Sequence, residues 1–349
     1  MTDTTEILGH QDTLQSTIFP SEPAEPTTSG LNKPFDLSGL TTYDLDSRPS
    51  KVFHDDLGKP VSPDCSIDDW LSSLPQQLAA QDIRRVTGHI ARAAREGRTV
   101  AAGIGGHVIK TGCAPYLIDW IQNGVLKAAA MNGSAAIHDF ELAVAGKTSE
   151  NVASQLPRGQ FGMARETADA FAVAARLGAE NELGLGAALG QYLDSQNPPF
   201  AESSLVLAAY RAGIPCTVHV ALGTDIVHMH PHVSGAALGE ASLVDFRRLC
   251  TVVASLQQGV WLNLGSAVIM PEVFVKAVSV AHNFGHDLDG LVTVNVDKQA
   301  QYRSRVNVVE RPSAEGFDLI GYHEILLPLL HVAVASQLAQ RSATKRQAA

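Results

Sequence analysis

The sequence has few cysteines and no long apolar run, and these absences exclude several classes of protein. Its 349 residues include only four cysteines, Cys65, Cys113, Cys216 and Cys250, which are widely separated and form no Cys-x-x-Cys motif. A zinc ribbon or a disulfide scaffold is therefore not indicated, and we expect a reducing, cytoplasmic location. No stretch approaches the roughly 18 apolar residues of a membrane span. The N-terminus also lacks the basic and apolar regions of a signal peptide.

Basic residues are scarce relative to acidic ones. The 26 lysines and arginines are outnumbered by 36 aspartates and glutamates, which gives a formal net charge of −10. Because binding to nucleic acid phosphates requires a basic surface, we expect no nucleic acid partner and no membrane partner. The length suffices for one large α/β domain or two smaller ones. A small-molecule substrate is the remaining expectation.

The chain is expected to contain one folded domain between two unstructured ends. Residues 1–50 are rich in Thr, Ser, Pro and Asp without sustained periodicity, which predicts a disordered or surface-wrapping arm. Apolar residues at spacings of three and four predict a helix over residues 68–98. We predict a single domain over residues 51–340 and a flexible tail over residues 341–349.

Strands followed by glycine-containing turns and helices recur along this domain. The first two strands lead into such turns, and helices are predicted from Pro115 to Gln122 and from about Ala136 onward. This alternation predicts an α/β fold with a Rossmann-like parallel sheet and helices on both faces. The predicted strands cover residues 99–103, 126–131, 217–222, 260–264, 291–296 and 306–309.

Polar side chains are concentrated just after the strand predicted at residues 217–222. Thr224, Asp225, His228, His230 and His232 lie within ten residues of one another. Ligands of open α/β sheets bind beyond the carboxyl ends of the strands. Asp225 is the strongest candidate, because a carboxylate there can bind a ribose hydroxyl or an ammonium group, or act as a base. The alternative is that it caps the following turn.

The histidines of this segment allow two interpretations. In an extended loop His228, His230 and His232 would point to the same side, and with Asp225 or His219 they would form a zinc or iron site. Their spacing matches no helical metal motif, so we favour a polar loop that lines the substrate and predict no metal. His219 lies inside the strand, where a buried, hydrogen-bonded histidine is the simpler interpretation.

Glycine-rich turns and one further carboxylate complete the candidates. Gly103-Ile-Gly-Gly departs from the Gly-x-Gly-x-x-Gly pattern, but backbone N–H groups at a helix start can hold a phosphate. The alternative is that these glycines only let a strand and a helix pack closely. Gly265-Ser266 repeats the arrangement after another strand. Glu272 is a weaker candidate, because the helix dipole favours it and Lys276, four residues later, predicts a solvated ion pair.

The order of these segments resembles the deoxyhypusine synthase family over roughly residues 75–340. No segment is specific by itself, so the resemblance depends on their order and spacing. It implies a Rossmann-like parallel sheet, NAD as cofactor, and a homotetramer with active sites between paired subunits. In that family spermidine is oxidised and an aminobutyl group is transferred to a lysine. The matching segments are Ala102-Gly-Ile-Gly-Gly-His-Val-Ile-Lys-Thr-Gly112, Ala129-Ala-Met-Asn-Gly-Ser-Ala-Ala-Ile-His-Asp139, Gly213-Ile-Pro-Cys, Ala221-Leu-Gly-Thr-Asp225, Asp245-Phe-Arg-Arg, Leu264-Gly-Ser-Ala-Val-Ile, Val292-Thr-Val-Asn-Val and Leu327-Pro-Leu-Leu.

Carried over residue by residue, the resemblance implies a set of NAD contacts. The chain also departs from the family's pattern at two places. The acidic pair after the second glycine turn is here Ile137-His138, with only Asp139 kept. The family's nucleophilic lysine is missing, since no lysine occurs from Gln299 to Thr344. An imine-forming step then has no nucleophile, so we do not expect deoxyhypusine synthesis itself. The implied NAD contacts are Gly106, His107, Lys110, Gly133, Ser134, Asp225, Gly265, Ser266, Asn295 and Val296.

We therefore expect an oligomeric NAD-dependent oxidoreductase or transferase that acts on a small, amine-containing molecule. Asp225, His228 and His230 are the main catalytic candidates, and His219 and Glu272 are secondary ones. In this hypothesis Asp225 holds a cationic amine while a loop histidine moves the proton. Two alternatives remain: a metal-dependent hydrolase or lyase that uses the histidine loop, and a non-catalytic binding protein on the same fold.

Overall fold

The computed structural model describes residues 33–347, and its contacts divide the chain after Lys51 into two units. In the first unit, residues 33–51 contain one short 3-10 helix, η2 (Leu45–Ser47). The remainder of the predicted arm, residues 1–32, lies outside the described residues. The second unit begins at Val52 and contains the sheet. No helix within residues 33–347 is long and apolar enough to cross a membrane.

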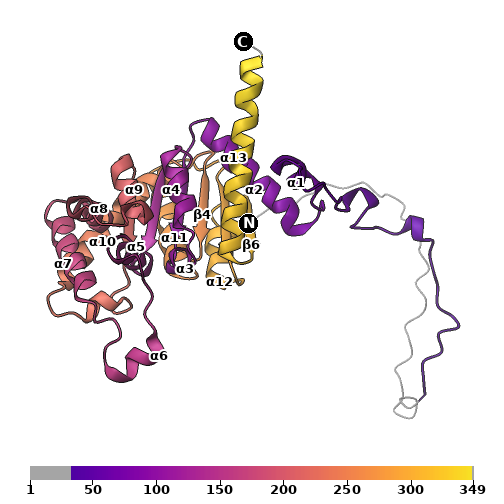
Figure 1. Cartoon of the computed structure of the whole chain (residues 1–349). Helices are drawn as coiled ribbons and strands as arrows, with labels where there is room; N and C mark the ends of the chain where they lie inside the picture. Colours follow the sequence, from indigo (N-terminus) through magenta and orange to yellow (C-terminus); the bar gives the residue numbers. More distant parts are fainter. Residues whose placement is uncertain (1–32, 348–349) are drawn as a thin grey trace, which may run out of the picture. The chain divides into compact units, whose positions relative to one another are not determined.

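Within the described residues, six strands form one parallel sheet (Figure 1). Their order across the sheet is β3-β2-β1-β4-β5-β6, and each neighbouring pair is parallel. This is the strand order of Rossmann folds, in which the direction of winding reverses between β1 and β4. The predicted α/β fold with a parallel sheet is confirmed. The strands are β1 (Val100–Ile104), β2 (Ala128–Asn132), β3 (Cys216–His219), β4 (Val260–Leu264), β5 (Val292–Asp297) and β6 (Glu315–Ile320).

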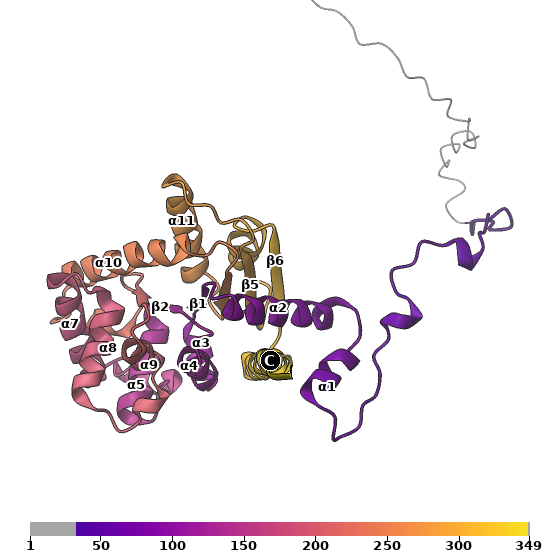
Figure 2. The same cartoon turned by 90° about the horizontal axis from the view of Figure 1, so that it is seen from above.

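Helices cover both faces of this sheet (Figure 2). Successive strand residues point to opposite faces, so Ala102 belongs to one buried cluster and Ala101 to the other. Helices α2, α4, α5, α8, α9 and α13 pack on the first cluster, and α10 and α11 supply most of the second. The helices are α1 (Ile67–Ser73), α2 (Leu78–Arg95), α3 (Gly106–Lys110), α4 (Ala114–Gln122), α5 (Gly133–Ala145), α6 (Val152–Gln155), α7 (Arg165–Glu180), α8 (Gly184–Gln196), α9 (Leu205–Ala212), α10 (Gly235–Ala254), α11 (Ile269–Asn283), α12 (Tyr302–Ser304) and α13 (His323–Gln347).

Trp261 of β4 explains why the neighbouring position in β1 is a glycine. The indole is fully buried and stacks on Phe274, with ring centroids 4.3 Å apart and an interplanar angle of 2°. Gly103 lies beside Trp261 on the same face of the sheet, and a Cβ at Gly103 would lie 2.8 Å from the indole. The first glycine of the Gly103-Ile-Gly-Gly turn is therefore required by packing.

The structure corrects the prediction of the last strand. Residues 306–309, predicted as a strand, lie in the π-helix η7 (Arg305–Glu310), and the edge strand is β6. A short valine-rich run does not distinguish a buried strand from a buried helix. The β6 segment contains Glu315, Gly316 and Asp318, residue types that are uncommon in strands. The last helix continues to Gln347, through most of the segment predicted as a flexible tail.

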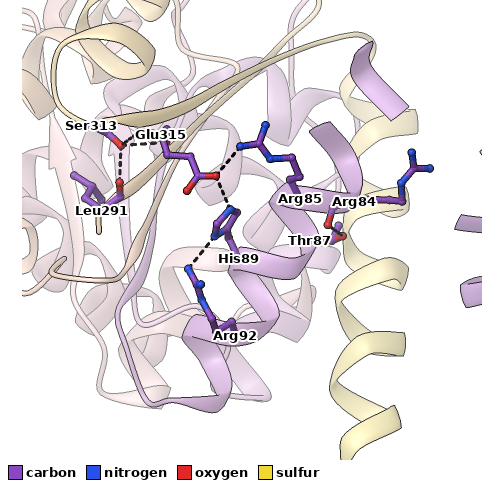
Figure 3. A network of polar contacts seen from close by, with 8 residues as sticks. All are labelled: Arg84, Arg85, Thr87, His89, Arg92, Leu291, Ser313 and Glu315. Atoms are coloured by element: carbon purple, nitrogen blue, oxygen red, sulfur yellow. Dashed lines mark hydrogen bonds and ion pairs between the residues drawn. The ribbon is translucent and has the colours of Figure 1, made fainter. Parts of the chain in front are cut away.

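A polar cluster ties the edge strand β6 to α2 (Figure 3). Glu315 Oε1 accepts hydrogen bonds from Arg85 at 2.8 Å and from His89 Nε2 at 3.0 Å. Arg92 donates to Nδ1 of His89 at 3.0 Å, which leaves the ring proton on Nε2. The Arg85 guanidinium also lies 4.8 Å from the centroid of Phe317. Charged side chains of this kind protect the open edge of a sheet from further pairing.

The buried carboxylate of Asp139 anchors the start of α9. It accepts hydrogen bonds from Ser204 Oγ at 2.5 Å and from the backbone N–H groups of Leu205 at 2.7 Å and Val206 at 3.2 Å. A carboxylate at a helix N-terminus is favoured by the unpaired N–H groups and the helix dipole. Asp139, which the family resemblance singles out, thus has a structural role in this chain.

We predict that Asp139→Ala lowers the free energy of unfolding by about 2–4 kcal/mol, because it leaves several buried donors without an acceptor. Asp139→Asn retains one oxygen and should lose less. The exposed Asp64 provides the control, since Asp64→Ala should change stability by no more than about 0.5 kcal/mol. Urea denaturation measures all three variants. A loss for Asp139→Ala no larger than that of the control would contradict the structural role.

Candidate functional site

Two glycine turns meet where the direction of winding of the sheet reverses. β1 is followed by Gly105 and Gly106, and β4 by Gly265. The Gly105 N–H donates to Leu264 O at 2.8 Å, and a Cβ on Gly105 would overlap the carbonyl oxygen of Gly265. The two turns are therefore in direct backbone contact at the place where open α/β sheets bind ligands.

Basic side chains surround these turns. His107 and Lys110 lie on α3, immediately after Gly106, and Lys298 follows β5. Burial and the positive charges of His323, Lys298 and Lys110 lower the pKa of His107. Basic side chains gathered beside a turn in this way favour the approach of an anion.

The turn after β2 joins the same site. The side chain of Asn132 caps α5 by accepting the Ala135 N–H at 2.9 Å. A Cβ on Gly133 would overlap the carboxylate of Asp225, and a Cβ on Gly106 would overlap the hydroxyl of Ser134. The structure thus brings together Gly106, Gly133, Ser134 and Asp225, four residues that the family resemblance assigned to one binding site.

Asp225 is a buried carboxylate that receives no hydrogen bond from another side chain in the described part of the protein. It precedes the 3-10 helix η6 (Ile226–Met229) and takes part in a capping box with His228. The capping role that the sequence allowed as an alternative to ligand binding is therefore present. Its side chain is only 9% exposed, and burial raises its pKa to about 6. A buried carboxylate in this state is stabilised when a cation or a further donor approaches.

His228 faces Asp225 with a proton that has no acceptor. Its Nδ1 accepts the backbone N–H groups of Gly223 at 3.1 Å and Asp225 at 3.2 Å, which places the ring proton on Nε2. Nε2 is buried without a hydrogen-bond partner among the described residues and lies 3.9 Å from Asp225 Oδ2. This distance is too long for a hydrogen bond. Donor and acceptor are therefore not paired with each other.

The Asp225 side chain lines a cavity of about 220 Å³ beside α5 and η6. This volume is below the roughly 300 Å³ at the lower end of drug-sized sites, so the cavity suits a small ligand. A larger cavity of about 640 Å³ lies at the opposite end of the strands, where they begin. Thr99 and Lys127 are among the residues that line it. The smaller cavity is lined by Lys110, Ser134, His138, Glu141, Thr224 and Asp225, among others.

The other loop histidines point elsewhere. His230 Nε2 is 2.9 Å from Gly162 O, and His232 Nε2 pairs with Asp169 Oδ1 at 2.9 Å. Because the segment forms η6 rather than an extended loop, the expectation that all three histidines point to one side is wrong. In residues 33–347, no group of three or more His, Cys, Asp or Glu side chains is arranged to hold a metal. The metal-dependent alternative therefore gains no support.

His219 and Glu272 are held by neighbours and are not among the residues that line the cavity. His219 is buried, its Nε2 is 2.9 Å from Thr217 Oγ1, and burial lowers its pKa to about 3. It is a neutral core histidine. Glu272 pairs with Lys276 and Arg303, and hydrogen bonds to these side chains lower its pKa against the opposing effect of burial. It joins α11 to α12.

Three residues with predicted cofactor contacts are engaged within the protein. The carboxamide of Asn295 accepts from Asn263 Nδ2 and donates to Asp318 Oδ1, both at 2.7 Å, across three neighbouring strands. Ser266 Oγ caps α11 by accepting the Met270 N–H at 3.1 Å. Val296 is buried, and its carbonyl oxygen accepts the Gly265 N–H at 2.9 Å. Their cofactor contacts stay predictions.

Two histidines beside the site were not selected as candidates from the sequence. His323 opens α13, and its Nε2 lies 3.1 Å from Val296 O while its ring contacts His107 at a centroid distance of 5.4 Å. Because the last strand was predicted at residues 306–309 instead of at β6, the sequence did not show that His323 lies just after the end of a strand. His138 lies four residues after Ser134, on the same face of α5. That helical spacing was visible in the sequence.

Comparison with known proteins shows a similar fold and does not identify an activity. No model of a known protein family matches the chain, and no curated protein matches it. The structure of AgrE in complex with ornithine and NAD⁺ matches with a TM-score of 0.50 and 15% identity over 76% of this chain. The match spans only 34% of AgrE, about a third of its length.

Two other solved structures match over more of their own length. A protein from Methanococcus maripaludis S2 described as LOR/SDH has a TM-score of 0.48 and 16% identity, over 76% of this chain and 71% of that protein. A protein from Entamoeba histolytica described as a deoxyhypusine synthase has a TM-score of 0.45 and 11% identity, over 80% and 96% of the two chains. The match to AgrE shows a similar fold, and its identity is too low to assign a function to this chain.

Proposed function

We propose that the protein is an NAD-binding enzyme that acts on a small molecule with an amino group. The observation that carries this proposal is the buried carboxylate of Asp225, which lines the cavity without a side-chain donor of its own. An ammonium group supplies both the charge and the hydrogen bonds that this carboxylate lacks. His228 Nε2 would donate to an acceptor on the same ligand.

The glycine turns and the basic side chains around them fit NAD. The two glycine turns are in contact beside the start of α3, and Lys110 and Lys298 supply positive charge near it. These groups would hold the diphosphate of the cofactor. Bound NAD would supply a hydride acceptor to the site. The NAD⁺ in the AgrE complex supports the same assignment.

The chemistry left to the protein's own residues is non-covalent. No lysine occurs from Gln299 to Thr344, so we assign no imine-forming step. Asp225 binds and orients the amine, and His228 or a neighbouring histidine moves a proton. The homotetramer implied by the family resemblance belongs to this proposal. A non-catalytic binding protein would share the ligands, and reduction of NAD⁺ with an amine separates the two cases.

We predict that calorimetry detects NAD⁺ binding and that Lys110→Gln weakens it about three- to tenfold, the effect of losing one charge-assisted contact. Lys127→Gln is the matched control, because the Lys127 ammonium donates to Gly97 O at 2.6 Å at the opposite edge of the sheet. Native mass spectrometry of the same samples reports the oligomer. The absence of titratable NAD⁺ binding, or an equal loss in the control, would count against the cofactor assignment.

We predict opposite effects of Asp225→Asn on stability and on binding. Burial raises the folded-state pKa of Asp225 from 3.8 to about 6, so ionisation destabilises the fold at pH values above 6 and the penalty disappears as the pH falls towards 4. The variant should therefore be more stable at pH 7.5, by about 1–3 kcal/mol, and gain little at pH 4. Urea denaturation at both pH values measures this, with Asp64→Asn as the surface control.

Binding of amines should change in the other direction. Wild-type affinity for a cationic amine should fall as the pH drops below 6, where Asp225 takes up a proton, and Asp225→Asn should lose the affinity at all pH values. L-Ornithine is the first probe for calorimetry, because it is the amine in the AgrE complex. Unchanged amine affinity in Asp225→Asn would remove the proposed role of this carboxylate.

A further inference from the structure

His138 is held by a chain of hydrogen bonds that fixes its proton. The ring lies on α5 with its side chain 15% exposed, and its Nδ1 is 2.7 Å from Thr148 Oγ1. The Thr148 hydroxyl donates to Glu141 Oε2, and Thr167 Oγ1 donates to Glu141 Oε1 at 3.1 Å. Because the one hydroxyl proton of Thr148 is engaged with Glu141, Thr148 accepts from His138. The proton of neutral His138 is therefore on Nδ1, and Nε2 carries a lone pair.

His138 lines the cavity, and the second nitrogen of its ring is free. Nε2 has no hydrogen-bond partner within residues 33–347, and the adjacent ring atom Cδ2 would lie 3.3 Å from a Cβ on Gly106. His138, Lys110 and Asp225 line the same cavity. Burial and the Lys110 ammonium lower the pKa of His138 to about 4, which keeps the ring neutral at physiological pH. The cavity thus presents the Asp225 carboxylate and a separate neutral acceptor, while the Glu141 and Glu150 carboxylates in its lining accept hydrogen bonds from Thr148, Thr167 and the Gly162 N–H.

We propose that His138 is a specificity-determining residue, whose Nε2 accepts a hydrogen bond from a neutral O–H or N–H group of the ligand whose ammonium binds Asp225. This inference rests on the proposed function of the same site. The Lys110 ammonium disfavours a second positive charge at His138. The ligand class is therefore a small amine that carries one further, uncharged hydrogen-bond donor, such as an amino alcohol. A site built to bind such a donor discriminates against an analogue that lacks it.

The state of the His138 ring is testable without a ligand. ¹⁵N NMR of the full chain should show His138 neutral at pH 7, with its proton on Nδ1. Thr148→Val removes the acceptor, so the ring proton should no longer be fixed on Nδ1. Thr148→Ser keeps the hydroxyl, so the proton should remain on Nδ1. A wild-type ring with its proton on Nε2, or a tautomer unchanged by Thr148→Val, overturns the inference. The conservative Ser variant shows whether any change follows from general disruption of the fold.

Matched ligands test the specificity itself. Calorimetry compares ethanolamine with ethylamine, and the longer pairs up to aminopentanol with pentylamine. The best amino alcohol should bind about three- to tenfold more tightly than its alkylamine, the range expected for one hydrogen bond. His138→Phe should abolish this preference and retain alkylamine binding, while Asp225→Asn should lose both ligands. Equal wild-type affinity for the two series overturns the role of His138 alone, and failure of both series to bind overturns the amine-binding function as well.

Discussion

The backbone contact between Gly105 and Gly265 is the constraint on which the site depends. A side chain at Gly105 would overlap the carbonyl oxygen of Gly265, so β1 and β4 can end side by side only with glycine at this position. Since winding reverses between these strands, the elements that follow them diverge: α3 packs on one face and α11 on the other. The basic residues of α3 lie beside the point at which the two turns meet.

Asp139, Asp245 and Asp225 are three aspartates with enclosed side chains, and they differ in the donors they receive. Asp139 accepts three hydrogen bonds at the start of α9, and Asp245 accepts the N–H groups of Gly186 and Val218, each at 2.8 Å. Asp225 is similarly enclosed but receives no donor from another side chain, and the nearest one, His228 Nε2, remains 3.9 Å away. Burial of a carboxylate with so few donors is unfavourable unless a ligand supplies more. This shortage of donors supports the proposal that Asp225 binds a ligand.

The sequence was sufficient to predict features that depend on the order of elements along the chain. It was insufficient to predict contacts with residues distant in the sequence. Parallel strands end at one edge of a sheet, so the clustering of Gly106, Gly133 and Asp225 follows from strand order. The ladder that engages Asn295 joins residues of three separate strands and has no local pattern. The histidine segment was misjudged because a 3-10 turn replaced the expected extended loop. The edge strand β6 was not predicted because its residues have a weak preference for strands, and its pairing with β5 outweighs that preference.

Lys110 connects the two halves of the proposed site. The family resemblance places a nucleophilic lysine between Gln299 and Thr344, where this chain has none, whereas Lys110 both follows the first glycine turn and lines the cavity. Its positive charge contributes to the low pKa of His138. An anion bound at the glycine turn would offset that charge and raise the pKa of His138. In the proposed site, occupation of the cofactor side would then make His138 a better proton acceptor on the substrate side, which would couple the two ligands through electrostatics.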